Sequence, residues 1–86
     1  MEVATSELYE IFRTNMKEMR EEGGISQQEL SQLTGIKQPQ LSELERGKTN
    51  PQLATIAKIA EALEVPPWIM LRPAKTRAAK KILVTA

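Results

Sequence analysis

Eighty-six residues with no cysteine and no histidine exclude most catalytic and metal-binding classes of protein. The chain is long enough for one small domain, has no thiol for a disulfide or zinc site, and lacks the commonest general base. It also has no secretion signal and no apolar run near the roughly 20 residues that cross a bilayer. We therefore expect a cytoplasmic protein that is not an enzyme and uses no cofactor or metal.

The charged residues are unevenly distributed, although the formal net charge is only +1. Residues 1–36 carry three basic and seven acidic side chains, whereas residues 37–86 carry nine basic and four acidic ones, which gives formal charges of −4 and +5. The C-terminal part therefore has the positive potential that a polyanion-binding face requires, although a solvated basic tail would give the same asymmetry.

The first predicted element is a helix from about Ser6 to Glu22. Apolar side chains recur there every three or four positions, as on one face of a helix, at Leu8, Ile11, Phe12, Met16 and Met19. Gly23-Gly24 is expected to end this helix. Ser26 and Glu29 then form a capping box, because each side chain can satisfy a free amide at the start of a helix from Gln27 to about Thr34.

A very short turn separates this second helix, whose Leu30 and Leu33 are expected to face the core, from a third. Gly35 suits a left-handed helix end, and the third helix is expected over residues 38–46, because a proline is tolerated in a first helical turn. Such a tight turn sets one helix across the other and leaves one face of the latter outward. The third helix is therefore the element that we expect to recognise a binding partner such as DNA.

Two further helices are expected after Gly47. Asn50-Pro51 is interpreted as the cap and first residue of a fourth helix, with an apolar stripe at Leu53, Ile56, Ala57, Ala60 and Leu63. Residues 65–71 are expected to form a short fifth helix. These elements predict one helix-turn-helix domain over residues 1–73 and a tail over residues 74–86, which is basic at Lys75, Arg77, Lys80 and Lys81 and then apolar at Ile82, Leu83 and Val84.

The outward face of the third helix is polar. If Leu41 and Leu44 form its buried edge, 100° per residue leaves a ridge of amide, hydroxyl and carboxylate side chains facing outward. A DNA major groove about 12 Å wide admits such a helix, and a glutamine amide can pair with one adenine edge. The candidate base-reading residues are Gln38, Gln40, Ser42 and Glu43. Each alone could be a solvated surface residue, but their presence on one helix favours DNA reading.

Candidate phosphate contacts surround this ridge. Gln27 and Gln28 lie at the start of the second helix, whose free amides attract anions, although plain capping also explains the sequence there. Lys37, Arg46 and Lys48 bracket the third helix and would make contacts that do not depend on DNA sequence. Ordinary solvated surface is the alternative for these three cations.

In combination and order, these motifs resemble the Cro/cI-type helix-turn-helix family, also called the xenobiotic-response-element family. The resemblance spans residues 19–71 and is carried by Arg20, residues 26–30, Gly35, Gln38, residues 44–48, Pro51, Leu53 and residues 59–63. It implies an all-α, five-helix, lambda-repressor-like fold. It also implies a transcriptional regulator that binds double-stranded DNA at specific sequences and is expected to act as a repressor.

The resemblance further implies roles for single residues. Gln27 would hold a backbone phosphate and brace the reading helix, and Gln38 would contact a base edge. Arg20 and Glu45 would form a structural ion pair between the first and third helices. Breaking one member of such a buried pair costs roughly 3 to 5 kcal/mol.

The fifth predicted helix is similar to the family segment that packs the core and meets its counterpart in a dimer. Its large apolar residues are Trp68, Ile69, Met70 and Leu71. So short a chain has little spare core for four such residues in succession, so at least one is expected to face a partner. A two-fold homodimer would place two reading helices about 34 Å apart, on successive major grooves.

Two other classes of function compete with a homodimeric regulator. The chain also resembles HigA-type antitoxins, which bind both an operator and a toxin; residues 47–53 are compatible with them, and the apolar segment 82–85 could add a strand to a toxin sheet. An enzyme ranks last, because aspartate is also absent and the glutamates are scattered. Double-stranded DNA and a second copy of the chain are the expected partners, without a membrane or a small-molecule ligand.

Overall fold

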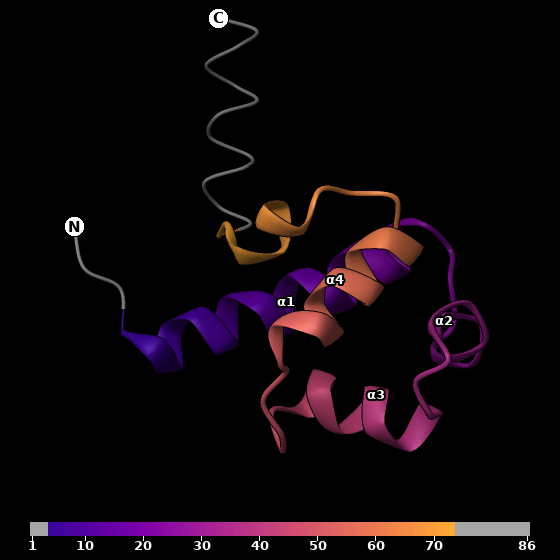
Figure 1. The fold of residues 1–86 in the computed structure, drawn as a ribbon, viewed down its shortest axis with the longest axis horizontal. Coiled ribbons are helices and arrows are strands. Elements are labelled where there is room, and N and C mark those ends of the chain that lie inside the picture. Colours follow the sequence, from indigo (N-terminus) through magenta and orange to yellow (C-terminus); the bar gives the residue numbers. More distant parts are fainter. Residues whose placement is uncertain (1–3, 74–86) are drawn as a thin grey trace, which may run out of the picture.

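The computed structural model describes residues 4–73, which form four α-helices and one 3-10 helix without any strand (Figure 1). The elements are α1 (Thr5–Glu22), α2 (Gln27–Thr34), α3 (Gln38–Arg46), α4 (Leu53–Ala62) and the 3-10 helix η1 (Pro67–Leu71). The all-α fold expected from the sequence is thus found. The predicted tail, residues 74–86, lies outside the described residues.

The fifth predicted helix is a 3-10 helix and not an α-helix. Pro66 caps this helix and Pro67 is its first residue, where a proline is tolerated because amides of a first turn have no acceptor within the helix. The bonds that define the helix span three residues: the Ile69 amide donates to the Pro66 carbonyl at 3.0 Å, and the Arg72 amide to the Ile69 carbonyl at 3.2 Å. Because a 3-10 helix has three residues per turn, side chains three positions apart in η1 lie on the same side of it.

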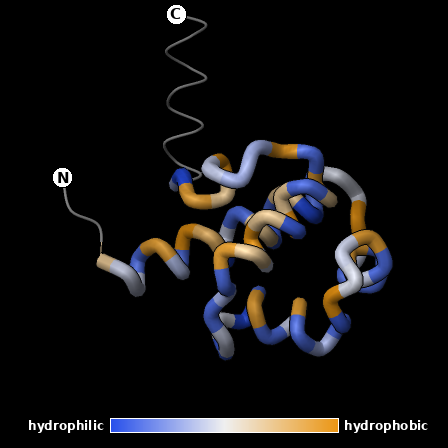
Figure 2. The backbone as a smooth tube through the Cα atoms, viewed as in Figure 1, coloured by the Kyte–Doolittle hydropathy of each residue, from blue (hydrophilic) through white to orange (hydrophobic). Residues whose placement is uncertain are grey.

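The hydrophobic core lies where all five elements face one another. Figure 2 shows hydrophobic positions between the helices and hydrophilic ones along the outer edge of α3. Phe12 and Met16 contribute from the stripe predicted for α1, and they are 1% and 0% exposed. The other buried apolar residues are Leu30, Ile36, Leu41, Leu44, Ile56, Ile59, Ala60 and Met70.

Four details of the predicted helices are wrong. Leu33 is 62% exposed, because Leu30 alone carries α2 into the core and Leu33 lies at the edge of the contact with α4. The fourth helix begins at Leu53, after an extended Gln52 cap, and not at Pro51. Leu53 therefore occupies the first turn of α4 and is 81% exposed. Ala57, the remaining misplaced member of the predicted stripe, is also exposed.

A buried asparagine ties η1 to the middle of α1. Asn15 is 0% exposed, and its Nδ2 donates to the carbonyl oxygens of Met70 at 2.8 Å and Arg72 at 2.6 Å. Carbonyls at a helix end have no partner within the helix, and here a side-chain donor supplies one. The sequence interpretation missed this link, because an asparagine inside an amphipathic helix gives no local signal of a partner more than 50 residues away.

Candidate nucleic-acid interface

The start of α2 is fixed by the predicted capping box. The Ser26 hydroxyl accepts from the Glu29 amide at 3.0 Å, and the Ser26 amide donates to Glu29 Oε1 at 2.9 Å. Hydrogen bonding to the carboxylate, from the Ser26 backbone amide first and then from the Ser26 side chain, holds the pKa of the Glu29 carboxyl below its usual value. Ser26 thus satisfies the Glu29 amide of the first turn of α2, and the neighbouring Gln28 is exposed to solvent.

The turn between α2 and α3 is held by side-chain hydrogen bonds. Gly35 ends α2 with φ 77°, a left-handed conformation that favours glycine. Thr34 Oγ1 donates to the Leu30 carbonyl at 2.8 Å and accepts from the Ile36 amide at 3.1 Å, while the Ser31 hydroxyl donates to the Ile36 carbonyl. Ile36 is 8% exposed and anchors the turn in the core. The position of α3 relative to α2 is thus set locally.

The far end of α3 is bound to both preceding helices through one carboxylate. Glu45 accepts from Arg20 Nε of α1 at 2.7 Å and from Arg20 Nη2 at 3.1 Å, and from Gln27 Nε2 of α2 at 3.0 Å. The Arg20 and Glu45 side chains are only 12% and 5% exposed. This hydrogen-bonded carboxylate raises the pKa of Arg20 above its ordinary value. We call Arg20, Gln27 and Glu45 the α3 clamp.

The clamp and the buried edge of α3 leave its remaining surface open. Leu41 and Leu44 are 0% and 3% exposed, which is the inward edge predicted from the sequence. Of the four candidate base-reading residues, Gln38 and Gln40 are exposed and Ser42 and Glu43 are half-buried. The first turn of α3 is thus its most accessible part, and it presents two amide side chains.

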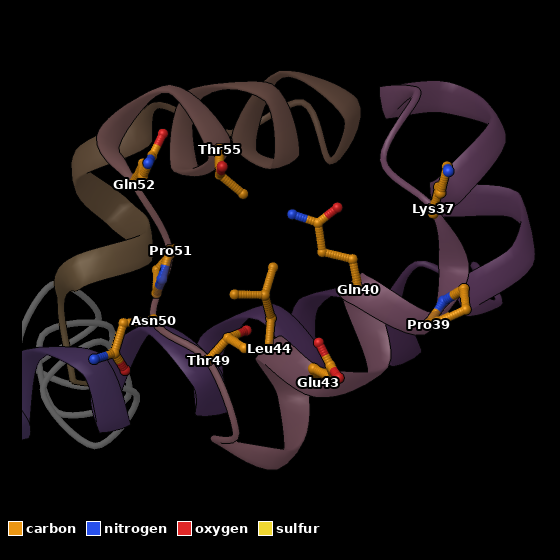
Figure 3. Close-up of a pocket in the computed structure, with 10 residues that line it drawn as sticks. All are labelled: Lys37, Pro39, Gln40, Glu43, Leu44, Thr49, Asn50, Pro51, Gln52 and Thr55. Carbon is orange, nitrogen blue, oxygen red and sulfur yellow. The ribbon is translucent and has the colours of Figure 1, made fainter.

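A polar hollow of about 540 Å³ runs between α3 and the segment that leads into α4 (Figure 3). Gln40 extends from α3 across this hollow toward Thr55 of α4. The opposite wall is formed by Thr49, Asn50 and Gln52. The sequence interpretation missed this wall, because Asn50 was read as a helix cap. Because α4 begins at Leu53, residues 49–52 lie outside the helix and border this hollow opposite α3.

The predicted phosphate-contacting residues surround the open part of α3. Lys37, Arg46 and Lys48 are exposed at its two ends, and Gln28 is exposed at the start of α2. Gln27 differs from them, because it is half-buried and its amide is engaged in the clamp. These groups place positive charge at both ends of α3.

One cation near α3 was not anticipated. Gly47 ends α3 with φ 76°, and a Cβ at this position would lie 2.8 Å from Nη1 of Arg13 on α1. The half-buried Arg13 guanidinium thus packs against the C-terminal end of α3, where the helix dipole favours a positive charge. A glycine next to Arg46 gave no sequence signal for this contact, because Arg13 precedes it by 34 positions.

The four residues proposed from the sequence as a dimer surface separate into two kinds. Trp68 is 67% exposed, and Ile69 and Leu71 are half-buried. Met70 is 0% exposed, so its assignment to an outer surface is corrected: it belongs to the core. The tight winding of η1 turns Met70 inward, against α1, while Trp68 projects into solvent.

Two short helices joined by a glycine turn, the second held at both ends and open along one polar side, define a helix-turn-helix unit. The chain belongs to the helix-turn-helix (HTH_3) family, whose model matches residues 16–67. The family and the fold are those of DNA-binding transcription regulators and not of enzymes. Within residues 4–73, no three acidic side chains gather as a metal site would need, and no helix has the length and apolar character to cross a bilayer.

Solved structures similar to this chain carry the same fold. A hypothetical transcription factor, NHTF, from Neisseria matches with TM-score 0.80 and 31% identity over 92% of this chain and 92% of that chain. An HTH_3 family transcriptional regulator from Vibrio cholerae matches with TM-score 0.73 and 30% identity over 78% of this chain and 38% of that chain. The restriction-modification controller protein C.AhdI from Aeromonas hydrophila matches with TM-score 0.67 and 33% identity over 70% of this chain and 91% of that chain. No curated protein matches the sequence.

Proposed function

We propose that this protein regulates transcription by binding double-stranded DNA at specific sequences as a homodimer, with α3 in the major groove. The observation that carries the proposal is the open first turn of α3, where Gln38 and Gln40 are exposed while the opposite edge of the helix is buried. A rigidly held helix enters a groove without an ordering cost, and the α3 clamp supplies that rigidity. We propose repression as the outcome, through occupation of the operator.

Gln38 is the proposed principal base-reading residue. It is the first residue of α3, and a glutamine amide can donate to and accept from the major-groove edge of one adenine at the same time. Glu43 is the proposed acceptor for a cytosine amino group, and Ser42 contacts either kind of base edge. Gln40 faces the polar hollow, which favours a contact at the side of the groove.

Lys37, Arg46 and Lys48 are the proposed phosphate contacts, with Gln27 and Gln28 at the start of α2. The three cations lie at the two ends of α3, where the two sugar-phosphate backbones border a groove-bound helix. Each neutralised phosphate releases condensed counterions, so binding is expected to weaken at least tenfold between about 50 and 200 mM salt. A flat salt dependence would count against these contacts.

The proposal is tested by selecting binding sites from random duplexes and then comparing two variants. Gln38→Ala is expected to weaken binding to the selected site by roughly 1 to 3 kcal/mol and to leave scrambled DNA unaffected. Lys48→Ala is the matched control, because it removes a phosphate contact and should weaken binding to both duplexes alike. Equal losses on both duplexes for Gln38→Ala would refute base reading by that residue.

Homodimerisation is part of this proposal and is supported by the exposed Trp68 of η1. A two-fold dimer presents two copies of α3 to successive major grooves about 34 Å apart. In the antitoxin alternative the toxin contact is assigned to residues 82–85, which lie outside the described residues, and no contact within residues 4–73 favours that alternative. We therefore retain the homodimeric regulator as the single proposed function.

A further inference from the structure

An apolar groove of about 390 Å³ opens between the N-terminal half of α1, the start of α4 and the end of η1. Phe12 and Ile56 form its floor and are 1% and 7% exposed, while the half-buried Leu8 and Leu71 stand at its sides. Leu53 projects at its rim with 81% of its surface exposed. Exposed apolar surface gathered in a groove marks an interaction site more strongly than scattered single residues do.

The outer wall of this groove precedes the region matched by the family model. That match begins at Met16, whereas α1 begins at Thr5, so three turns of α1 come before it. The N-terminal ones of these turns project beyond the body of the molecule in Figure 1, whereas the last one carries the buried Phe12 and Asn15. They still carry the apolar stripe of α1, of which Leu8 and Ile11 remain half-buried. The projecting turns thus present an apolar side that their own chain covers only in part.

A large exposed side chain stands beside the groove without lining it. Trp68 is 67% exposed and lies three residues before Leu71, which forms one side of the groove. Side chains three residues apart are eclipsed in a 3-10 helix, so Trp68 and Leu71 lie on the same side of η1. The same end of the molecule therefore offers an apolar projection and an apolar groove next to each other.

We propose that the groove of each protomer receives the Trp68 indole of a second copy of this chain, in a reciprocal contact around a two-fold axis. The proposal rests on the homodimer of the proposed function and assigns the residues that form it. Adjacent complementary features are what a two-fold interface requires, because each surface must meet a copy of itself. Tryptophan is also the residue type most enriched among the energetically dominant residues of interfaces.

The location of the groove fits simultaneous DNA binding by both copies. Pro51 and Gln52 line both this groove and the polar hollow beside α3, so the proposed interface borders the proposed DNA face. A partner docked there lies beside α3 and not behind it. A two-fold axis at this border can therefore point toward the DNA and leave both copies of α3 on the same side.

The size of the interface explains why the projecting turns of α1 take part. Two buried indoles remove roughly 300 to 500 Å² from water, whereas stable dimers bury about 1,200 Å² or more. The remainder must come from surface around the groove. The projecting turns of α1 and Leu53 supply apolar surface there, which places them in the interface with Trp68.

The test uses the full-length chain without DNA. Sedimentation equilibrium is measured for the wild type, Trp68→Ala, Leu53→Glu and the control Leu33→Glu, which adds the same charge at a 62% exposed leucine away from the groove. Trp68→Ala and Leu53→Glu should each weaken dimerisation by about thirtyfold or more, and Leu33→Glu should not. Unchanged thermal unfolding of dilute, monomeric samples shows that each variant folds.

A mixing experiment isolates the reciprocal contact. Trp68→Ala retains an open groove and Leu53→Glu retains the indole, so their mixture can form a heterodimer with one intact contact that neither variant forms alone. The chain has a single tryptophan, so its emission reports this site. Mixing should restore dimers and shift the Trp68 emission of Leu53→Glu to shorter wavelength.

Several results would overturn the proposal. These are a monomeric wild type, dimers that persist in both variants, or a mixture that stays monomeric. Loss of the dimer in Leu83→Glu, with solvent-like Trp68 emission in the wild type, would assign the groove to the C-terminal segment instead. The Gln38→Ala measurements on DNA do not depend on these results. If the proposed dimer contact is refuted, base reading by α3 is therefore still tested by those measurements.

Discussion

Removing the Glu45 carboxylate is expected to release α3 from both preceding helices. In Glu45→Ala, the Arg20 guanidinium loses two short hydrogen bonds and its counter-charge, and the Gln27 amide loses its acceptor. The Arg20 side chain is only 12% exposed, so water cannot fully replace these partners. The variant tests whether the clamp holds α3 in place.

The expected loss is large relative to the stability of so small a domain. Breaking one member of a buried ion pair costs about 3 to 5 kcal/mol. A chain of 86 residues is stable by roughly 4 to 13 kcal/mol in total. Because each kcal/mol shifts the Tm of a domain of this size by about 4 to 8 °C, a loss of 3 kcal/mol lowers the Tm by roughly 12 to 24 °C.

The measurement is thermal and urea unfolding followed by circular dichroism, on a double-mutant cycle of Arg20→Met, Glu45→Leu and the pair together. Replacing both charges with apolar residues of similar size removes the unpaired charge, so the double variant should be more stable than either single one. Strictly additive losses, or a Glu45→Ala variant within 1 kcal/mol of the wild type, would refute the clamp.

Three further changes probe the elements around α3. Gly47→Ala places a side chain at φ 76° and 2.8 Å from Arg13, whereas Gly35→Ala at φ 77° meets no atom within 4 Å. The left-handed backbone should lower the free energy of unfolding by about 1 to 2 kcal/mol in both variants, as measured by urea unfolding. A further loss in Gly47→Ala that disappears in the Arg13→Ala background would isolate the packing contact. Asn15→Leu leaves carbonyls of η1 without a donor and should cost about 1 to 3 kcal/mol, so an unchanged unfolding midpoint would contradict the anchoring role. The folded-state pKa of Glu29 is depressed, so its stabilising contribution is present above the ordinary glutamate pKa and is lost as the pH falls through the lower folded value. Glu29→Gln should therefore flatten the dependence of the free energy of unfolding on pH in this acidic range. An unaltered pH dependence would exclude the capping box as its cause.

Local signals in the sequence predicted the helix-turn-helix well. The Ser26 capping box and the left-handed Gly35 end depend on neighbouring residues alone, and both are found as expected. The inward edge of α3 follows from helical periodicity once Leu41 is taken as buried. These features are decided within one or two turns of chain, which is the range over which sequence patterns carry information.

The features that the sequence could not predict depend on contacts between distant segments. Leu53 and Leu33 fit an apolar stripe but lie beyond the edges of the core, because helix packing and not periodicity decides how far the core extends. Met70 and Trp68 are equally apolar in sequence, and the winding of η1 turns only Met70 inward. The role of Asn15 depends on the end of η1, where its side chain donates to the Arg72 carbonyl, and this contact has no signal in the sequence.

Binding to duplexes that carry 7-deazaadenine tests most directly whether α3 reads bases in the major groove. This base lacks the N7 acceptor on the major-groove edge and leaves the minor groove unchanged, so it removes one half of the proposed Gln38 contact. At one adenine of the selected site, we predict that the wild type loses affinity on this substitution while Gln38→Ala shows no further loss. Equal losses for both proteins at every adenine would contradict base reading by Gln38.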